Sequence, residues 1–214
     1  MSTIWIFDFD GTLVDSAVAI RRCFSKATQE LAPNRLLWCE KVLIGPPLPQ
    51  TAAQILGTED TGLVQQFIER FKTAYDGGEV LHTPTYPKAG ELLETLHARG
   101  DTLTIATNKR GKPTRLLINH LGWSPYFKSI VCIDDLIDPN QGKVQLVKNL
   151  MNDLAVNSSE CVFVGDTASD GKVALHHQIR FIFANYGYGK EDDWSSIKIH
   201  QTIHQPIELL TIHV

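Results

Sequence analysis

The chain has 214 residues, of which 43% are hydrophobic and 21% charged, and its formal net charge is −4. This is an ordinary globular composition, and the absence of any long Lys/Arg run argues against nucleic acid or a membrane surface as a partner. No apolar run reaches the roughly 20 residues that span a bilayer, and the N-terminus lacks the features of a signal peptide. Four scattered cysteines without a CxxC pair argue against zinc and favour a reducing, cytoplasmic location.

The first part of the chain predicts a buried strand followed by a helical module. Residues 3–9 form a short apolar run that ends in the turn Asp10-Gly11-Thr12. Apolar residues recur at helical spacing over residues 16–32 and again over 49–75, where the pattern is split near 57–60. We therefore expect residues 16–82 to form a small helical domain, inserted into a core domain made of residues 1–15 and 83–214.

The rest of the chain alternates predicted helices and strands. Helices are expected over 88–99, 114–121, 144–154 and 171–177, with a terminal helix opened by Pro206, and strands over 102–106, 128–133, 160–164, 180–184 and 197–203. This alternation with apolar strands predicts an α/β fold, in which helices cover both faces of a Rossmann-like, doubly wound parallel sheet. Right-handed crossovers place the carboxyl ends of the strands at one edge, where such sheets bind ligands.

Polar clusters follow three of the predicted strands, at residues 8–12, 107–109 and 165–170. Asp8 and Asp10 lie two residues apart and point to the same side of a strand. Asp166 and Asp170 are expected at the same edge of the sheet. Four carboxylates in one cleft form a hard oxygen site, which suits Mg²⁺ rather than a soft metal.

Three further residues suggest phosphoryl transfer at this edge. Thr107 and Asn108 bring a hydroxyl and an amide, and Lys143 adds a positive charge before a predicted helix. A metal and a lysine neutralise the charge of phosphoryl oxygens while an in-line oxygen attacks phosphorus. An aspartate can be that nucleophile, and a second one can act as general acid and base.

These motifs resemble those of the haloacid dehalogenase superfamily. The run from Asp8 to Ser16, DFDGTLVDS, resembles its first signature, and Ala106-Thr107-Asn108-Lys109 is similar to the second. Lys143 resembles the third, and the run from Gly165 to Asp170, GDTASD, the fourth. Within the superfamily the chain looks most like the phosphoglycolate-phosphatase-like branch, supported by the segments at 44–48, 86–87 and 186–189.

The resemblance implies a role for each motif residue. Asp8 would be the nucleophile and a metal ligand, and Asp10 the general acid and base, binding the metal through its backbone carbonyl. Asp166 would bind Mg²⁺ directly, and Asp170 in the second shell or through water. Phosphate binding is implied for Gly11, Thr107, Asn108 and Lys143. The helical domain would be a mobile cap with a substrate-facing loop at Gly45, Pro46 and Pro47.

The leading hypothesis is a Mg²⁺-dependent phosphatase that hydrolyses a small phosphate ester such as phosphoglycolate, as a monomer or homodimer. Sugar phosphates and nucleoside monophosphates are also possible substrates. A phosphomutase, a phosphonatase or a dehalogenase on the same scaffold would fit the motifs too, as would a non-catalytic phosphate-binding module. Three departures from the family pattern bear on the site. Val144 follows Lys143 where relatives commonly carry proline, Gly171 follows Asp170 where they usually have an apolar residue, and Asn140-Gln141-Gly142 makes the approach to Lys143 polar. For Lys109, a surface turn and a substrate contact are equally consistent with the sequence.

Overall fold

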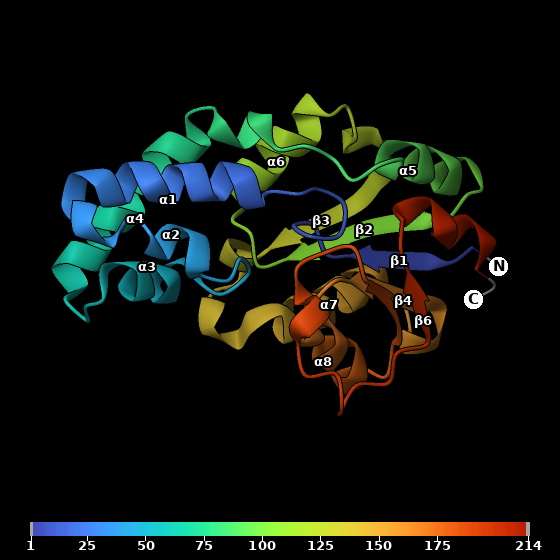
Figure 1. Ribbon diagram of the computed structural model, residues 1–214. Coiled ribbons are helices and arrows are strands. Elements are labelled where there is room, and N and C mark those ends of the chain that lie inside the picture. The colour runs from blue at the N-terminus through green and yellow to red at the C-terminus, as the bar shows by residue number, and fades with distance from the viewer. Residues whose placement is uncertain (1, 213–214) are drawn as a thin grey trace. The chain divides into compact units, whose positions relative to one another are not determined.

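The protein, described by a computed structural model over residues 2–212, divides into two compact units (Figure 1). One unit consists of Met1–Asp15 and Pro84–Val214, and the other of Ser16–Thr83. None of the helices within residues 2–212 combines the length and the apolar character that a membrane crossing requires.

The first unit is built around a six-stranded sheet, as the sequence predicts. Its spatial order is β3-β2-β1-β4-β5-β6, and every neighbouring pair is parallel. The strands are β1 (Ile4–Phe7), β2 (Thr102–Thr107), β3 (Phe127–Cys132), β4 (Cys161–Gly165), β5 (Arg180–Ala184) and β6 (Gln201–Ile203). Because β1 lies between β2 and β4, the ends of these three strands are adjacent at one edge of the sheet.

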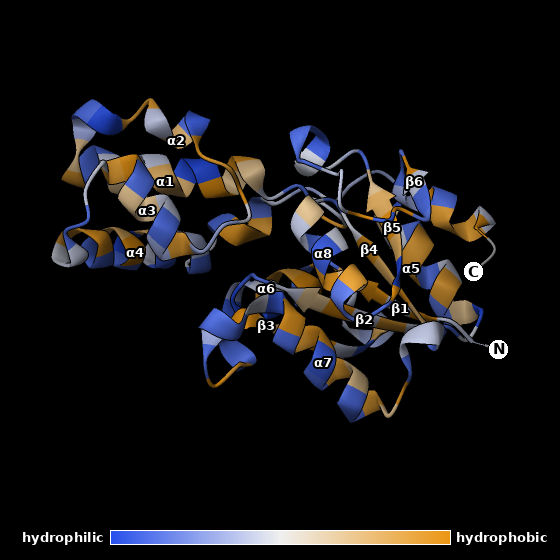
Figure 2. Ribbon diagram, turned by 90° about the horizontal axis from the view of Figure 1, so that it is seen from below, coloured by the Kyte–Doolittle hydropathy of each residue, from blue (hydrophilic) through white to orange (hydrophobic). Residues whose placement is uncertain are grey.

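Helices cover both faces of the sheet (Figure 1). One face carries α5 (Ala89–Ala98) and α6 (Gly111–His120), and the other α7 (Gly142–Leu154) and α8 (Ala168–His176). In Figure 2 the central strands are largely orange, whereas the flanking helices alternate orange and blue along their length. On the side of α7 and α8, buried residues from four strands and these two helices form one cluster that includes Ile6, Phe163, Val147 and Val173. Burying each such side chain contributes about 1.5–3 kcal/mol.

Four elements differ clearly in bounds or helix type from what the sequence suggested. Helix α8 begins at Ala168 rather than 171, because Thr167 and Asp170 form a capping box that starts the helix earlier. Helix α6 likewise begins at Gly111, three residues before the expected start. The last strand covers only Gln201–Ile203, and the terminal helix that Pro206 opens is a 3-10 helix, Pro206–Thr211.

The second unit contains the helices α1 (Ala17–Leu31), α2 (Trp38–Lys41), α3 (Leu48–Leu56) and α4 (Thr61–Asp76). Helices α1 and α4 pack through aromatic rings, with the Phe24 centroid 5.9 Å from that of Phe67 and 5.1 Å from that of Phe71. Asp60 caps α4 by accepting a hydrogen bond of 2.8 Å from the Gly62 amide. The sequence did not predict α2, since four residues are too few to show a helical period.

Candidate active site

Three strand ends carry the polar residues of the site. Asp8 follows β1, Thr107 ends β2, and Asp166 follows β4. The Asp8 amide donates a 2.9 Å hydrogen bond to the Val164 carbonyl, which continues the pairing of β1 with β4 just beyond the strand. The sheet order β2-β1-β4 therefore brings together residues that are about 150 positions apart in the sequence.

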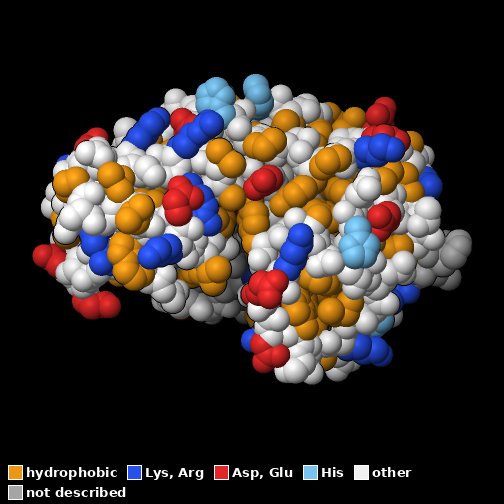
Figure 3. Space-filling model, viewed as in Figure 1, with side chains coloured by type: hydrophobic (Ala, Val, Ile, Leu, Met, Phe, Trp, Pro, Cys, Tyr) orange, Lys and Arg blue, Asp and Glu red, His pale blue; other side chains and the backbone are white. Residues whose placement is uncertain are grey.

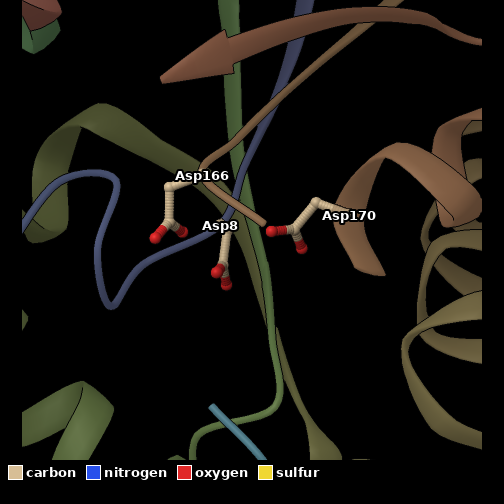
Figure 4. A group of neighbouring side chains, drawn as sticks. All are labelled: Asp8, Asp166 and Asp170. Atoms are coloured by element: carbon tan, nitrogen blue, oxygen red, sulfur yellow. The ribbon is translucent and has the colours of Figure 1, made fainter. Parts of the chain in front are cut away.

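Three carboxylates converge at this edge, from the end of β1, the end of β4 and the start of α8 (Figure 4). One oxygen from each of Asp8, Asp166 and Asp170 lies within 4.8 Å of the others. The exposed fraction is 7% for Asp8 and 0% for both Asp166 and Asp170. Such burial is costly for carboxylates unless they are paired or bind a cation.

Hydrogen bonds from neighbouring residues in the fold hold the carboxylates of Asp166 and Asp170. Asp166 accepts bonds from the Thr12 hydroxyl at 3.2 Å and from the Tyr188 amide at 2.7 Å. Asp170 accepts bonds from Thr167, at 3.1 Å from its amide and 2.6 Å from its hydroxyl. These contacts fix the carboxylates before any ligand binds.

Lys143 lies between two of the carboxylates. Its Nζ is 2.8 Å from Asp8 Oδ1 and 2.7 Å from Asp170 Oδ1, and its side chain is 5% exposed. Val144, the first departure from the family pattern, is partly buried against the core, and its carbonyl accepts a 2.8 Å bond from His177. Helix α7 begins at Gly142 and so directs Lys143 into the site without a proline.

Gly171, the second departure from the family pattern, has a packing reason. A Cβ at this position would overlap the side chain of Ile197, which covers the start of α8. The glycine therefore lets the segment after β5 lie close against the helix that carries Asp170.

The electrostatics of the cluster reflect burial and mutual repulsion. Burial raises the pKa of Asp8 to about 6, with Lys143 opposing and Asp170 adding to the rise. Burial, followed by the charges of Asp170 and Asp8, raises the pKa of Asp166 well above its ordinary value. Burial alone would lower the pKa of Lys143, but the Asp170 and Asp8 carboxylates outweigh it and raise the pKa.

The donor set fits a hard divalent cation. Asp8 Oδ1 is buried and contacts Lys143 as an ion pair, yet it accepts no well-aligned hydrogen bond from any described residue. The site contains four aspartates and two buried lysines, namely Asp8, Asp10, Asp166, Asp170, Lys109 and Lys143. When all six are ionised, they carry four negative and two positive charges. The excess of two negative charges equals the charge of one divalent ion, and oxygen-only ligands suit Mg²⁺.

Asp10 does not join the three-carboxylate cluster but pairs with Lys109. Lys109 Nζ is 3.0 Å from Asp10 Oδ1 and 3.1 Å from Oδ2, and the lysine side chain is 5% exposed. Of the two interpretations of Lys109 that the sequence allowed, a solvated surface turn is therefore wrong. The structure places this lysine in the site, although no sequence signal separated it from an ordinary turn residue.

The remaining predicted residues fall in two places. Thr107 is buried at the end of β2, and its hydroxyl accepts a 3.2 Å bond from the Lys109 amide. Gly11 lies against the Asp166 carboxylate, whereas the side chain of Asn108 is exposed. Gly45, Pro46 and Pro47 are exposed in the loop before α3 in the helical unit.

The loop after β5 supplies contacts that the sequence did not assign to the site. Tyr188 reaches Asp166 through its amide and donates its hydroxyl to Asp15 at 3.0 Å. A Cβ at Gly187 would overlap the Asp166 side chain and the Gly11 carbonyl, so only glycine lets this loop approach. The repeated Tyr-Gly pattern at 186–189 was the available signal, but it carried no indication of what the loop contacts.

A parallel α/β sheet with buried aspartates and a lysine at its carboxyl edge defines a class of Rossmann-like hydrolases. Residues 5–184 match the family model of the haloacid dehalogenase-like hydrolases. A 5'-nucleotidase from Pseudomonas aeruginosa is 29% identical over 212 residues, which cover 97% of this chain and 92% of that protein. A phosphoglycolate phosphatase from Rhodospirillum rubrum is 30% identical over 196 residues, which cover 87% of this chain and 80% of that protein.

The fold has a close counterpart among solved structures. A crystal structure of a predicted phosphoglycolate phosphatase from Haemophilus somnus has a TM-score of 0.85 at 21% identity, covering 98% of this chain and 97% of that chain. The chain belongs to the haloacid dehalogenase-like hydrolase family, in its phosphoglycolate-phosphatase-like branch. The resemblance drawn from the motifs is confirmed, as is the prediction of a phosphatase.

Proposed function

We propose that this phosphatase is Mg²⁺-dependent and hydrolyses a small phosphorylated metabolite through an aspartyl-phosphate on Asp8. The observation that supports this most directly is the buried cluster of Asp8, Asp166 and Asp170, with Lys143 ion-paired to two of its members. Buried carboxylates at this density fit a divalent cation, and an aspartate beside a cation and a lysine is suited to attack a phosphoryl group.

Asp8, Asp166 and Asp170 would hold the metal, the last directly or through water, together with the backbone carbonyl of Asp10. The metal would neutralise charge on the phosphoryl oxygens. Lys143 would add a second positive charge there, and Thr107, Gly11 and the backbone of Asn108 would donate hydrogen bonds to the same group.

The reaction would proceed in two displacements. In the first, an Asp8 carboxylate oxygen bonds to phosphorus as the ester P–O bond breaks, and Asp10 gives a proton to the departing alkoxide. In the second, Asp10 takes a proton from water, whose oxygen bonds to phosphorus as the bond to Asp8 breaks. Phosphate leaves, and Asp8 and Asp10 return to their starting states.

The helical unit would act as a cap that excludes water during turnover, with Gly45, Pro46 and Pro47 in a loop that contacts substrate. A cap of this size favours a small substrate. The phosphoglycolate phosphatase relative supports phosphoglycolate, and the 5'-nucleotidase relative supports a nucleoside monophosphate as the second candidate.

The surface and the thiols of the protein support a proposal for the setting of the enzyme. All four cysteines are free and buried, which fits a reducing compartment, and we place the enzyme in the cytoplasm. On the face drawn in Figure 3, charged side chains of both signs are interspersed without a large basic patch. A monomer or homodimer acting on a small phosphate ester fits these features.

The test is phosphate release from a panel of phosphoglycolate, sugar phosphates and nucleoside monophosphates, with Mg²⁺ and with EDTA. We expect Mg²⁺-dependent release, and loss of at least about 1,000-fold in kcat for Asp8→Asn. Asp153→Asn, an exposed carboxylate on α7, is the matched control and should retain full activity. Full activity of Asp8→Asn would exclude the nucleophile assignment, and no turnover of any ester would favour a non-catalytic phosphate-binding module.

Different reactions on the same scaffold would give different products. A phosphomutase would yield an isomeric phosphate ester rather than free phosphate, and a dehalogenase would release halide without using Asp10. A phosphonatase would form a Schiff base with a lysine, which borohydride would trap in the presence of substrate.

A further inference from the structure

Lys109 is a buried cation that none of the proposed catalytic steps uses. It follows β2 by two residues, in the turn that carries Thr107, and its ammonium contacts both carboxylate oxygens of Asp10. A lysine this buried is rare unless it is paired, so the contact with Asp10 accounts for its position. On the proposed function, Asp10 is the group that moves protons.

The backbone around Lys109 is held at both ends. Its amide donates to the Thr107 hydroxyl at 3.2 Å, and its carbonyl accepts from the Ile133 amide, beyond β3, at 3.4 Å. The backbone from which the Lys109 side chain extends is therefore fixed to the end of the sheet. Asp10 lies in a tight turn in which the Leu13 amide donates to the Phe9 carbonyl at 2.9 Å and the Gly11 amide to the Val14 carbonyl at 2.8 Å.

We propose that Lys109 is a positioning residue that holds the Asp10 carboxyl group in its reactive orientation through the two-oxygen contact. An aspartate side chain rotates freely when nothing contacts it, and the proton transfer requires its oxygen within hydrogen-bond reach of the ester oxygen. Misplacing a reacting group by about 1 Å can reduce a rate about 100-fold. Lys109 acts on the reaction through Asp10, whereas Lys143 acts on Asp8 and the phosphoryl group. This inference rests on the proposed function.

The test exploits the difference between leaving groups. An alkoxide needs a proton from Asp10 as it departs, whereas p-nitrophenolate leaves with little help. The ratio kcat/KM reports only the steps up to departure of the leaving group, so it excludes the later attack of water. For Lys109→Met, we expect kcat/KM to fall about 10- to 100-fold for the best alkyl ester of the panel and less than about 3-fold for p-nitrophenyl phosphate.

Two further variants test whether a loss of rate in Lys109→Met reflects misfolding rather than the lost contact with Asp10. Lys109→Arg can also donate to both oxygens of a carboxylate, and we expect it to recover part of the lost rate on the alkyl ester. Lys112→Met removes an exposed lysine three residues away on α6 and should leave both rates unchanged. In an Asp10→Asn background, Lys109→Met should have no further effect on kcat/KM, because its action passes through Asp10.

Several results would overturn the inference. Equal losses on both esters, or losses that multiply with Asp10→Asn, would make Lys109 a structural or phosphoryl-binding residue. A rise in KM without a fall in kcat would make it a substrate contact, and unchanged rates would leave it no role. If the wild-type protein with Mg²⁺ hydrolysed neither ester, the proposed function would fail and the inference with it.

Discussion

The backbone N–H of Tyr188 donates a 2.7 Å hydrogen bond to Asp166 Oδ2, joining the loop after β5 to a member of the buried carboxylate cluster. The contact spans 22 residues of sequence and depends on the glycine that precedes the tyrosine. This bond gives the Asp166 carboxylate a hydrogen-bond donor, which solvent cannot supply because the side chain is fully buried. The loop is therefore part of the candidate site, although Tyr188 contacts Asp166 through its backbone rather than through a charged group.

Gly187→Ala should damage this arrangement. The new Cβ would overlap the Asp166 side chain and the Gly11 carbonyl, so the loop or the carboxylate must move. We expect Mg²⁺ affinity to fall by about 10-fold or more, as when the partner of a metal ligand is lost. Isothermal titration of Mg²⁺ measures the affinity, and circular dichroism checks that the variant is folded. Unchanged affinity in a folded variant would show that the loop does not support the site.

Lys143→Met should reduce the stability of the metal-free protein and the activity of the protein with Mg²⁺. Removing the ammonium leaves Asp8 and Asp170 buried without their common ion-pair partner. Breaking a buried pair in this way costs about 3–5 kcal/mol, and loss of a charge that stabilises the transition state costs about 100- to 1,000-fold in kcat. Urea unfolding and p-nitrophenyl phosphate turnover measure the two effects.

The matched control for that variant is Lys148→Met, an exposed lysine five positions along the same helix. It removes the same charge without touching the site, and it should change stability by less than about 0.5 kcal/mol. Similar losses for the two variants would mean that Lys143 acts only through net charge.

Mg²⁺ should stabilise the protein most at alkaline pH. The folded-state pKa of Asp8 is raised to about 6 from an ordinary value of 3.8, mainly by burial. Without metal, ionising Asp8 therefore destabilises the fold progressively as the pH rises from about 3.8 to about 6, where the penalty reaches its full value, and the penalty is relieved as the pH falls back through that range. Mg²⁺ needs the ionised carboxylates, so its binding weakens where they are protonated.

Thermal unfolding with and without Mg²⁺ at about pH 8 and about pH 5 measures this difference. At a free concentration 100 times its Kd, Mg²⁺ should stabilise the fold by about 2.7 kcal/mol at the higher pH and much less at the lower. Asp166→Asn should abolish the shift at both. A shift that did not depend on pH would argue against metal binding by these carboxylates.

The cysteines should be inert in the folded protein. Burial, followed by the charge of Glu79, raises the pKa of Cys23 to about 12. Burial also raises the pKa of Cys132 and Cys161 to about 11 in each case. The thiolate is the reactive form, so a thiol reagent at about pH 8 should label none of the four cysteines until the protein is denatured. A fast-labelling thiol in the native protein would contradict the burial of that side chain.

Much of the core fold follows from patterns that lie within single segments. The apolar run of β1 and the helical period of α7 are local, so the alternation of strands and helices and the resulting parallel sheet could be predicted. The same logic anticipated that the ends of β1, β2 and β4 meet. Local patterns predicted the ends of elements less well than their existence. A capping box sets the start of α8, and the helix opened by Pro206 is a 3-10 helix rather than an α-helix.

By itself, the sequence determined the family, the parallel sheet and the strand ends at which Asp8, Thr107 and Asp166 lie, because signature residues follow strands whose ends must be adjacent. Only the tertiary structure decided which side chains pair there. The contact of Lys109 with Asp10 joins residues 99 positions apart, and that of Thr12 with Asp166 joins residues 154 apart. No spacing or period encodes such pairings, since they depend on how separate elements pack and which buried charges then need a partner.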